Sequence, residues 1–145
     1  GRPGRRSFDD RLGDLMGSAG RRRTDLCLAV MLLDEFPSEA DTRGQRAGER
    51  LLREVAAALA GQLRGEDVLA RSGGREFAVA FASSDMSGAA SLARRLRRAL
   101  PPGATASIGI AAWRASERPE ELLRRAEHAL SEARRGGRDQ VAIAP

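Results

Sequence analysis

The chain has 145 residues, a length that fits one domain with a sizeable hydrophobic core. Hydrophobic residues make up 41% of it and charged residues 31%, which is typical of a soluble globular protein and excludes an intrinsically disordered one. All 25 basic residues are arginines and the net charge is +5, so the composition is compatible with an anionic partner. No apolar run approaches the ~20 residues of a membrane span, and a single cysteine, Cys27, is too few for a disulfide framework or a cysteine metal cluster. We therefore expect a domain of the reducing cytoplasm that makes no direct contact with a membrane.

The spacing of the apolar residues predicts alternating helices and strands. Phe8 and Leu12 recur at helical spacing, and the unbroken apolar run 26–33 is typical of a central strand covered on both faces. A Gly-Gly turn at 73–74 predicts a hairpin, and we expect Ser87 to cap the helix that follows it. In chain order we predict a helix over 5–20, a strand over 26–33, a helix over 49–63, strands over 68–71 and 77–81, a helix over 87–100, a strand over 104–112, a helix over 119–135 and a strand over 141–144. This order predicts an α/β fold with helices packed on a mixed sheet of about five strands.

The hairpin segment 71–77, Arg-Ser-Gly-Gly-Arg-Glu-Phe, resembles the signature turn of the GGDEF diguanylate cyclase family, with Arg75 where the family has an acidic residue. Four further segments resemble the family in the same order: Gly-Arg-Pro-Gly-Arg-Arg-Ser-Phe at 1–8, the stretch 34–49 that opens with Asp-Glu-Phe, Thr-Ala-Ser-Ile-Gly-Ile at 105–110, and Ala-Glu-His-Ala-Leu-Ser-Glu-Ala-Arg at 126–134 with Gly-Arg at 137–138. The resemblance covers almost the whole chain. It implies the palm fold of nucleotidyl cyclases, in which helices flank a central mixed sheet, and a place in cyclic di-GMP signalling.

The resemblance also implies where the catalytic residues of the family would stand, and several of those positions carry other residue types. The family condenses two GTP molecules with metal ions held by carboxylates of the first strand and the hairpin, and these positions are Leu32 and Arg75 here. A fixed positive charge about 4 Å from a divalent ion repels it by roughly 8 kcal/mol at an effective dielectric constant of 20. The residues that read guanine in the family fall on Ala40 and Glu49, while Glu76 of the hairpin is retained. We therefore expect a degenerate site with no enzymatic activity, no bound magnesium and no other cofactor.

A second site of the family is an inhibitory site for its own product, built from an Arg-x-x-Asp motif before the hairpin and an arginine on the next helix. Arg64 and Asp67 stand at the expected offset from the hairpin, and Arg95 falls on the expected helix. Arginine can hold a phosphate or the O6/N7 edge of guanine with two hydrogen bonds, and a carboxylate can accept from guanine N1 and N2. The resemblance thus implies a receptor that binds cyclic di-GMP through Arg64, Asp67 and Arg95, as an intercalated dimer.

We expect a single domain over 1–145, with a lead-in helix and linker over 1–24 and the core over 25–145. The chain begins without methionine and inside the family's opening motif, so we expect it to be a piece of a longer, multidomain protein. The domain would relay its signal to an upstream region or to a partner, and it could form a homodimer. The parent protein could be anchored in a membrane.

Four other interpretations stay open. The domain could be a scaffold that dimerises or docks a protein without binding nucleotide. It could be a weak residual cyclase that uses Asp34 and Glu76 as metal ligands, although we expect Asp34 to point away from the face of Leu32. Arg75 could neutralise a triphosphate in place of a metal, which would give a metal-independent nucleotide site. The fourth is a module that binds nucleic acid, although we expect no specific binding, because the 3% aromatic content gives no stacking platform and acidic residues alternate with arginines over 120–127.

Overall fold

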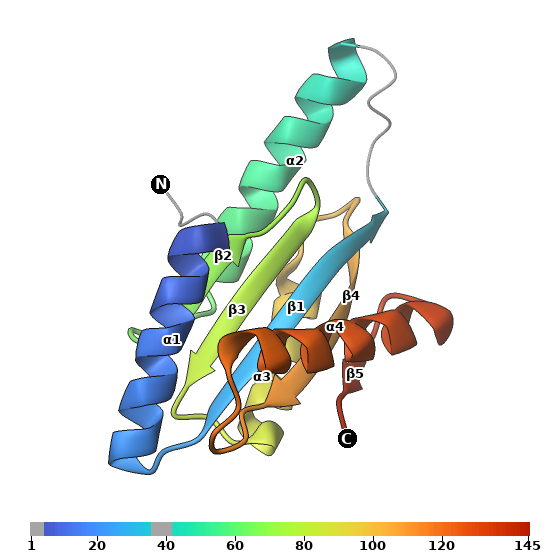
Figure 1. Cartoon of the computed structure of the whole chain (residues 1–145). Helices are drawn as coiled ribbons and strands as arrows, with labels where there is room; N and C mark the ends of the chain where they lie inside the picture. Colours follow the sequence, from blue (N-terminus) through green and yellow to red (C-terminus); the bar gives the residue numbers. More distant parts are fainter. Residues whose placement is uncertain (1–4, 36–41) are drawn as a thin grey trace.

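A five-stranded mixed sheet forms the centre of the molecule in the computed structural model, which describes residues 5–35 and 42–145. The strand order is β2-β3-β1-β4-β5, with β1 in the middle (Figure 1). The strands are β1 Leu26–Glu35, β2 Val68–Arg71, β3 Glu76–Ala82, β4 Thr105–Ala112 and β5 Val141–Ile143. Neighbouring strands pair antiparallel except β4 and β5, which are parallel. The expected mixed sheet of about five strands is confirmed.

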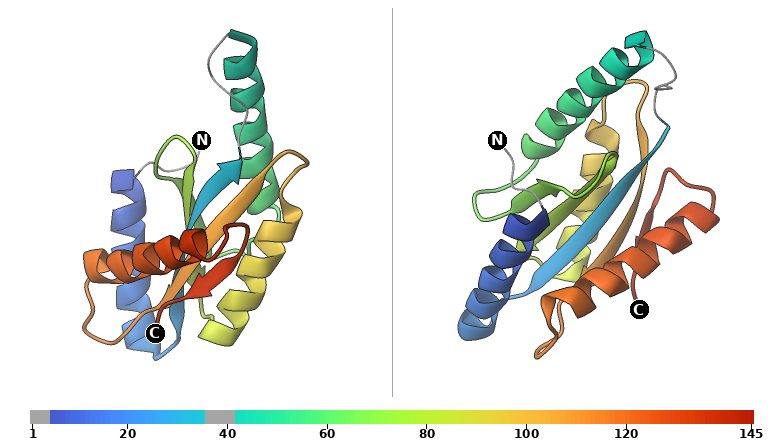
Figure 2. Two further views of the ribbon diagram at one scale, coloured as in Figure 1. Left: turned by 90° about the vertical axis from the view of Figure 1, so that its right-hand side faces the viewer. Right: turned by 45° about the horizontal axis from the view of Figure 1, so that its top comes forward.

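Four helices cover the two faces of this sheet, as the two views of Figure 2 show. They are α1 Arg5–Arg22, α2 Thr42–Ala60, α3 Met86–Ala99 and α4 Pro119–Arg135. The apolar residues of α1 and α4 pack on one face, and those of α2 and α3 pack on the other. None of the helices in the described ranges is long and apolar enough to cross a membrane.

The apolar run of β1 supplies both halves of the core. Leu28 and Val30 face α1 and α4, whereas Ala29 and Met31 face α2 and α3. Successive side chains of a strand point to opposite faces, so a strand with helices on both sides must be apolar at every position. The expected central strand is confirmed. The first helix, expected as a lead-in, also belongs to the core because Phe8 is buried with this cluster.

Two helix starts differ from the expectation. The helix α2 begins at Thr42 and not at residue 49, since the arginine-rich first turns carry few apolar residues that would reveal a helical period. The cap of α3 is Asp85 and not Ser87: the main-chain N–H of Gly88 donates to Asp85 Oδ1 at 2.8 Å, while Ser87 lies exposed in the first turn. A carboxylate at the N-cap position accepts a hydrogen bond from a main-chain N–H group of the first turn, as a serine hydroxyl would.

The loop that leads into α4 is fixed by a partly buried ion pair. Arg125 Nε donates to Glu117 Oε2 at 2.7 Å, and its Nη2 donates to Glu117 Oε1 at 2.8 Å. The hydrogen bonds from Arg125 are the main cause of a lowered pKa of the Glu117 carboxyl group. This bidentate pair holds α4 in position over β4.

Candidate functional site

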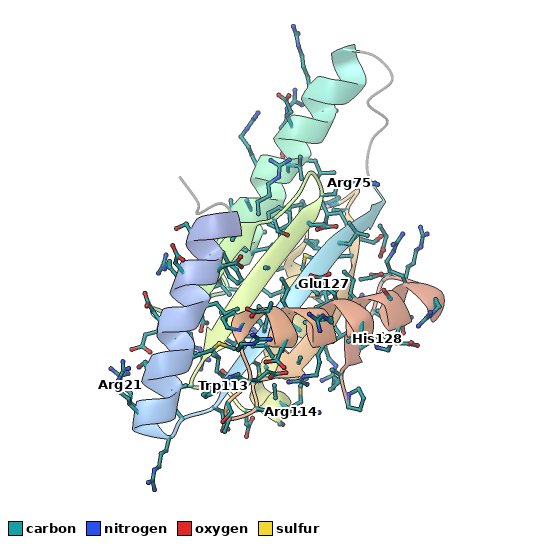
Figure 3. All side chains as sticks on the ribbon, viewed as in Figure 1. Arg21, Arg75, Trp113, Arg114, Glu127 and His128 are labelled. Atoms are coloured by element: carbon teal, nitrogen blue, oxygen red, sulfur yellow. The ribbon has the colours of Figure 1, made fainter. Side chains whose placement is uncertain are left out.

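A cavity of about 320 Å³ opens between the sheet and α4, at the end of the sheet where the hairpin β2–β3 meets β1. Its apolar wall includes Phe8, Leu32 and Leu130, and its polar lining includes Ser72, Glu76, Glu127, Ser131 and Arg134. Figure 3 shows Glu127 on α4 and Arg75 at the tip of the hairpin, beside the end of β1. The cavity therefore joins the first strand and the hairpin, where the resemblance implies a degenerate active site, to the last helix.

The register of the sheet brings two of the predicted positions together. Leu32 of β1 pairs with Glu76 of β3 and, on its other side, with Ser107 of β4. Cross-strand partners in an antiparallel pair point to the same face, so Leu32 and Glu76 share the face that α4 covers. A leucine side chain thus stands where the family resemblance implies a carboxylate, and it makes this end of the cavity apolar.

The hairpin tip is held in place by main-chain contacts. The N–H of Leu33 donates to the carbonyl oxygen of Arg75 at 3.0 Å, and Arg71 Nη2 donates to the carbonyl oxygen of Gly74 at 2.7 Å. Arg75 itself is exposed. These contacts position the residue after the Gly-Gly turn beside the last residues of β1.

The expectation for Asp34 was wrong. Ser107 Oγ donates to Asp34 Oδ1 at 2.7 Å, and the main-chain N–H of Asp139 donates to Asp34 Oδ2 at 2.9 Å. Because Ser107 pairs with Leu32, Asp34 lies on the same face as Leu32 and not on the opposite one. Residues two positions apart in a strand share a face, which is the rule that decides this case. Both carboxylate oxygens of Asp34 already accept a hydrogen bond.

Two carboxylates, Glu76 and Glu127, line this cavity, whereas the two positions at which the family resemblance implies metal ligands carry Leu32 and Arg75. Leu32 offers no oxygen, Arg75 brings a positive charge, and Asp34 is engaged with neighbouring donors. No group of three or more His, Cys, Asp or Glu side chains within the described ranges could hold a metal ion. Ala40 lies outside the described residues, and Glu49 is exposed on α2 and does not line the cavity.

A second site lies in the turn between α2 and β2, where the Arg-x-x-Asp motif stands. The Asp67 side chain is 1% exposed. Its Oδ2 accepts from the main-chain N–H of Arg64 at 3.0 Å, and its Oδ1 accepts from the main-chain N–H of Ala82 at 2.9 Å. Asp67 thereby closes the turn and ties it to the end of β3.

The guanidinium group of Arg64 is held at the surface by three partners. Its Nε lies 3.6 Å from Asp67 Oδ2, and its Nη2 donates to Ser84 Oγ at 2.5 Å and to the carbonyl oxygen of Ala82 at 3.4 Å. The side chain nevertheless stays 56% exposed. Arg64 is therefore oriented by the protein while its charged group remains accessible to a ligand.

Arg95 reaches the same turn from α3. Its Nη2 donates to Gln62 Oε1 at 3.1 Å, and Gln62 lies two residues before Arg64. Arg95 on α3 thus lies next to the segment that carries Arg64 and Asp67. Sequence reasoning missed the two orienting residues, Gln62 and Ser84, because a lone amide or hydroxyl near a loop carries no recognisable pattern.

The serine that orients Arg64 is anchored from inside the core. Cys27 Sγ donates to the carbonyl oxygen of Ser84 at 3.3 Å, and Cys27 is fully buried. Burial, with a smaller contribution from Asp25, raises the pKa of the Cys27 thiol to about 12. The thiol is therefore a neutral core group, as its place in an apolar run indicated.

Comparison with known proteins places this geometry in a family. A family model described as "Diguanylate cyclase, GGDEF domain" matches residues 1–140. The chain is 34% identical over 154 residues to diguanylate cyclase DgcP of Pseudomonas aeruginosa, and the match covers 99% of this chain and 23% of that protein. It is 30% identical over 139 residues to diguanylate cyclase A of Treponema denticola, where the match covers 88% of this chain and 38% of that protein. The chain therefore spans well under half the length of these two relatives.

Solved structures agree with these matches. The GGDEF domain of DgcB from Caulobacter crescentus, in complex with c-di-GMP, superposes with a TM-score of 0.90 at 29% identity over 98% of this chain and 88% of that chain. Diguanylate cyclase SiaD from Pseudomonas aeruginosa, in complex with its activator SiaC, superposes with a TM-score of 0.91 at 30% identity over 99% of this chain and 59% of that chain.

The comparisons contradict one expectation. We expected from the residues at positions 32 and 75 that the domain would not be an enzyme. The relatives that match nearly the whole chain are named diguanylate cyclases, which points to an enzyme.

Proposed function

The chain belongs to the GGDEF domain family of diguanylate cyclases, and on this premise we propose that it works in cyclic di-GMP signalling by binding cyclic di-GMP at the α2–β2 turn. The ligand would contact Arg64 and Arg95 with its phosphodiester groups or guanine edges. The DgcB domain that superposes on this chain is described in complex with c-di-GMP, which supports a ligand of this kind.

The orientation of Arg64 is the observation that carries the proposal. The Arg64 side chain is more than half exposed, yet contacts with Ser84 and Asp67 hold its guanidinium group in one place. A preoriented arginine loses little side-chain entropy when it binds, and its planar fork matches a phosphate or the guanine O6/N7 edge. Arg95 is exposed on the neighbouring helix, and Gln62 links it to the same turn.

The role of Asp67 in this proposal depends on whether the turn can open. Both of its oxygens accept main-chain hydrogen bonds and its side chain is nearly inaccessible. Each carboxylate oxygen has a second lone pair, so Asp67 can accept from guanine N1 or N2 only if the turn opens enough to admit the base edge. Without such an opening, Asp67 would position Arg64 and would not contact the ligand.

Calorimetric titration with cyclic di-GMP tests the proposal. We expect saturable binding to the wild-type domain, close to two ligands per site because the ligand would bind as an intercalated dimer. Arg64→Ala should abolish the binding, and Arg95→Ala should weaken it. Arg94→Ala is the matched control, because Arg94 is an exposed neighbour on α3 with no hydrogen bond or ion pair to a described residue.

Two results would overturn the proposal. No heat with the folded wild-type domain would favour a scaffold that binds no nucleotide. An equal loss of affinity for cyclic di-GMP in Arg94→Ala and Arg95→Ala would show that the arginines act only through the overall positive charge of the surface. Asp67→Asn with unchanged affinity would show that Asp67 neither contacts the ligand nor positions Arg64 for it, and would leave the proposal intact for the two arginines.

Diguanylate cyclase activity is the second candidate, favoured by the names of the relatives. The cavity at the hairpin would have to bind GTP with Glu76 and Arg134, which both line it. Incubation of the domain with GTP and magnesium or manganese, followed by chromatography for cyclic di-GMP, tests this directly. Product that disappears in Glu76→Gln would establish the activity.

We also propose that the output of ligand binding passes to another part of the parent protein or to a separate protein. The SiaD structure with its activator SiaC supports this for a relative of similar fold. A pull-down with and without cyclic di-GMP, using the parent protein, would test it, and an unchanged set of partners would argue against a ligand-controlled output.

A further inference from the structure

The positive charge of the molecule is concentrated on two helices. The sequences of α2 and α3 together contain eight arginines and two glutamates, a formal charge of +6, whereas the whole chain carries +5. The rest of the chain is therefore close to neutral. Since α2 and α3 pack on the same face of the sheet, the charge gathers on one side of the molecule (Figure 2).

Most of these arginines point outward. Leu52, Val55 and Leu59 define the buried stripe of α2, and the helical period places Arg50 and Arg53 opposite that stripe. All the outward arginines are exposed: Arg46, Arg50 and Arg53 on α2, and Arg94 and Arg98 on α3. We call these five residues the basic face.

Exposed Glu49 and Glu54 lie on α2 beside three arginines of the basic face, so five arginines and two glutamates leave a formal charge of +3 there. None of its five arginines forms an ion pair or side-chain hydrogen bond with a described residue. On α4, by contrast, Arg125 pairs with Glu117 and Arg135 with Glu132. The alternation of arginines with acidic residues that was expected over 120–127 on α4 is also present on α2, whereas α3 contains four arginines and no acidic residue.

We propose that the basic face binds double-stranded nucleic acid through its phosphate backbone, without reading sequence. Guanidinium forks pair with phosphate oxygens by two hydrogen bonds, and a duplex offers one negative charge per ≈ 1.7 Å of its axis. Between the arginines stand small residues such as Ala57, Ser87 and Ser91, together with the exposed carboxylates of Glu49 and Glu54 on α2, so the phosphate contacts would come from the arginines alone. Single strands need aromatic stacking platforms, which the face lacks.

The shape of the face favours a duplex over an anionic membrane. The first half of α2 extends past the ends of the strands in Figure 1, and Arg46 and Arg50 of this half are exposed. A helix of about 10–12 Å diameter fits the ≈ 12 Å width of a major groove. Binding at a membrane surface would be helped by exposed large apolar groups, and the only such residue among those described is Ile143, which lies on β5 and not on α2 or α3.

The test is a fluorescence anisotropy titration of the domain with a mixed-sequence DNA duplex over a series of salt concentrations. Each phosphate contact contributes about −0.9 to the slope of log K against log salt. We expect the triple variant Arg50→Gln, Arg53→Gln, Arg98→Gln to have a slope shallower by about 2.7 and a much weaker affinity at low salt. A matched control removes three exposed arginines from α1, its C-terminal turn and α4: Arg21→Gln, Arg23→Gln, Arg124→Gln (Figure 3 labels Arg21).

Three outcomes would overturn the inference. The first is no duplex binding by the wild-type domain at low salt. The second is an equal change of slope in the control triple, which would indicate general charge and not a face. The third is tighter binding, at the same salt, to vesicles of phosphatidylcholine and phosphatidylglycerol than to the duplex, which would identify a membrane as the partner. The basic-face triple keeps Arg64 and Arg95, so its cyclic di-GMP titration should be unchanged and separates this test from that of the proposed function.

Discussion

The close approach of α4 to β4 at Gly109 leads to a quantitative prediction. A Cβ added to Gly109 would lie 2.8 Å from the carbonyl carbon of Ala129, and closer still to the main-chain nitrogen of Leu130 and the carbonyl oxygen of Ala126. These are main-chain atoms of a helix and cannot rotate away, so α4 would have to shift as a body. Overpacking of this kind costs about 1–3 kcal/mol, and we expect the upper end of that range for Gly109→Ala.

Thermal unfolding followed by circular dichroism measures this cost. One kcal/mol corresponds to about 2–4 °C for a chain of this size, so Gly109→Ala should lower the melting temperature by about 6–12 °C. Gly13→Ala is the control, because nothing lies within 4 Å of a Cβ added there in α1. Replacing a helical glycine by alanine in open space should stabilise the domain by roughly 0.5–1 kcal/mol. An unchanged melting temperature in Gly109→Ala would refute the tight packing of α4 that places Arg134 at the cavity.

Three further predictions concern single groups. Asp67→Asn should lower the free energy of unfolding, measured in urea, by about 1.5–3 kcal/mol, because an amide cannot accept from both of the main-chain N–H groups that donate to Asp67. A smaller loss would mean that this carboxylate does not close the turn. The hydrogen bonds from Arg125 lower the pKa of Glu117 below its ordinary value of 4.5, so the stability it contributes is present above that pH and is lost as pH falls through the folded pKa. The free energy of unfolding of the wild type should thus fall more than that of Glu117→Gln on acidification below about pH 4.5. If the free energies of the two proteins fall in parallel with pH, the ion pair between Glu117 and Arg125 does not contribute to stability. Cys27 is fully buried with its thiol pKa raised to about 12, so Ellman's reagent should label it at neutral pH only after unfolding, and rapid labelling of the native domain would contradict its burial.

The sequence was most informative where a local pattern decides the structure. An eight-residue apolar run without polar interruption is compatible with a strand covered on both faces, and β1 is that strand. The helix α4 begins at Pro119, because proline fits the first helical position and lacks only an N–H group that would have no partner within the helix. It ends before Gly136. Where two residues could serve the same local purpose, as with Asp85 and Ser87 at the start of α3, the pattern did not decide between them.

For the candidate sites, the sequence indicated which residues to consider but not how their side chains are held. The resemblance singled out Arg64, Asp67 and Arg95, and in the structure Arg64 and Asp67 share a turn that Arg95 reaches from α3 through Gln62. Which atoms face a ligand depends on contacts between residues that are distant in the sequence. The Asp67 carboxylate accepts a hydrogen bond from the main chain of Ala82, and Ser84 orients Arg64. Such contacts are fixed by the packed sheet, so no motif within the sequence could reveal them.

The two proposed binding surfaces border one another, and this gives a final prediction. Arg64 and Arg95 lie at the end of α2 and on α3, beside the arginines of the basic face. Cyclic di-GMP is itself built of phosphodiesters, so a bound ligand would neutralise two arginines that a nucleic-acid backbone could also reach. If both proposals hold, saturating cyclic di-GMP should make the salt slope of duplex binding shallower by up to about 1.8, since each lost contact removes about 0.9. The Arg64→Ala variant should show no such effect of the ligand. A duplex affinity that rises with cyclic di-GMP would instead mean that the two surfaces do not share these arginines.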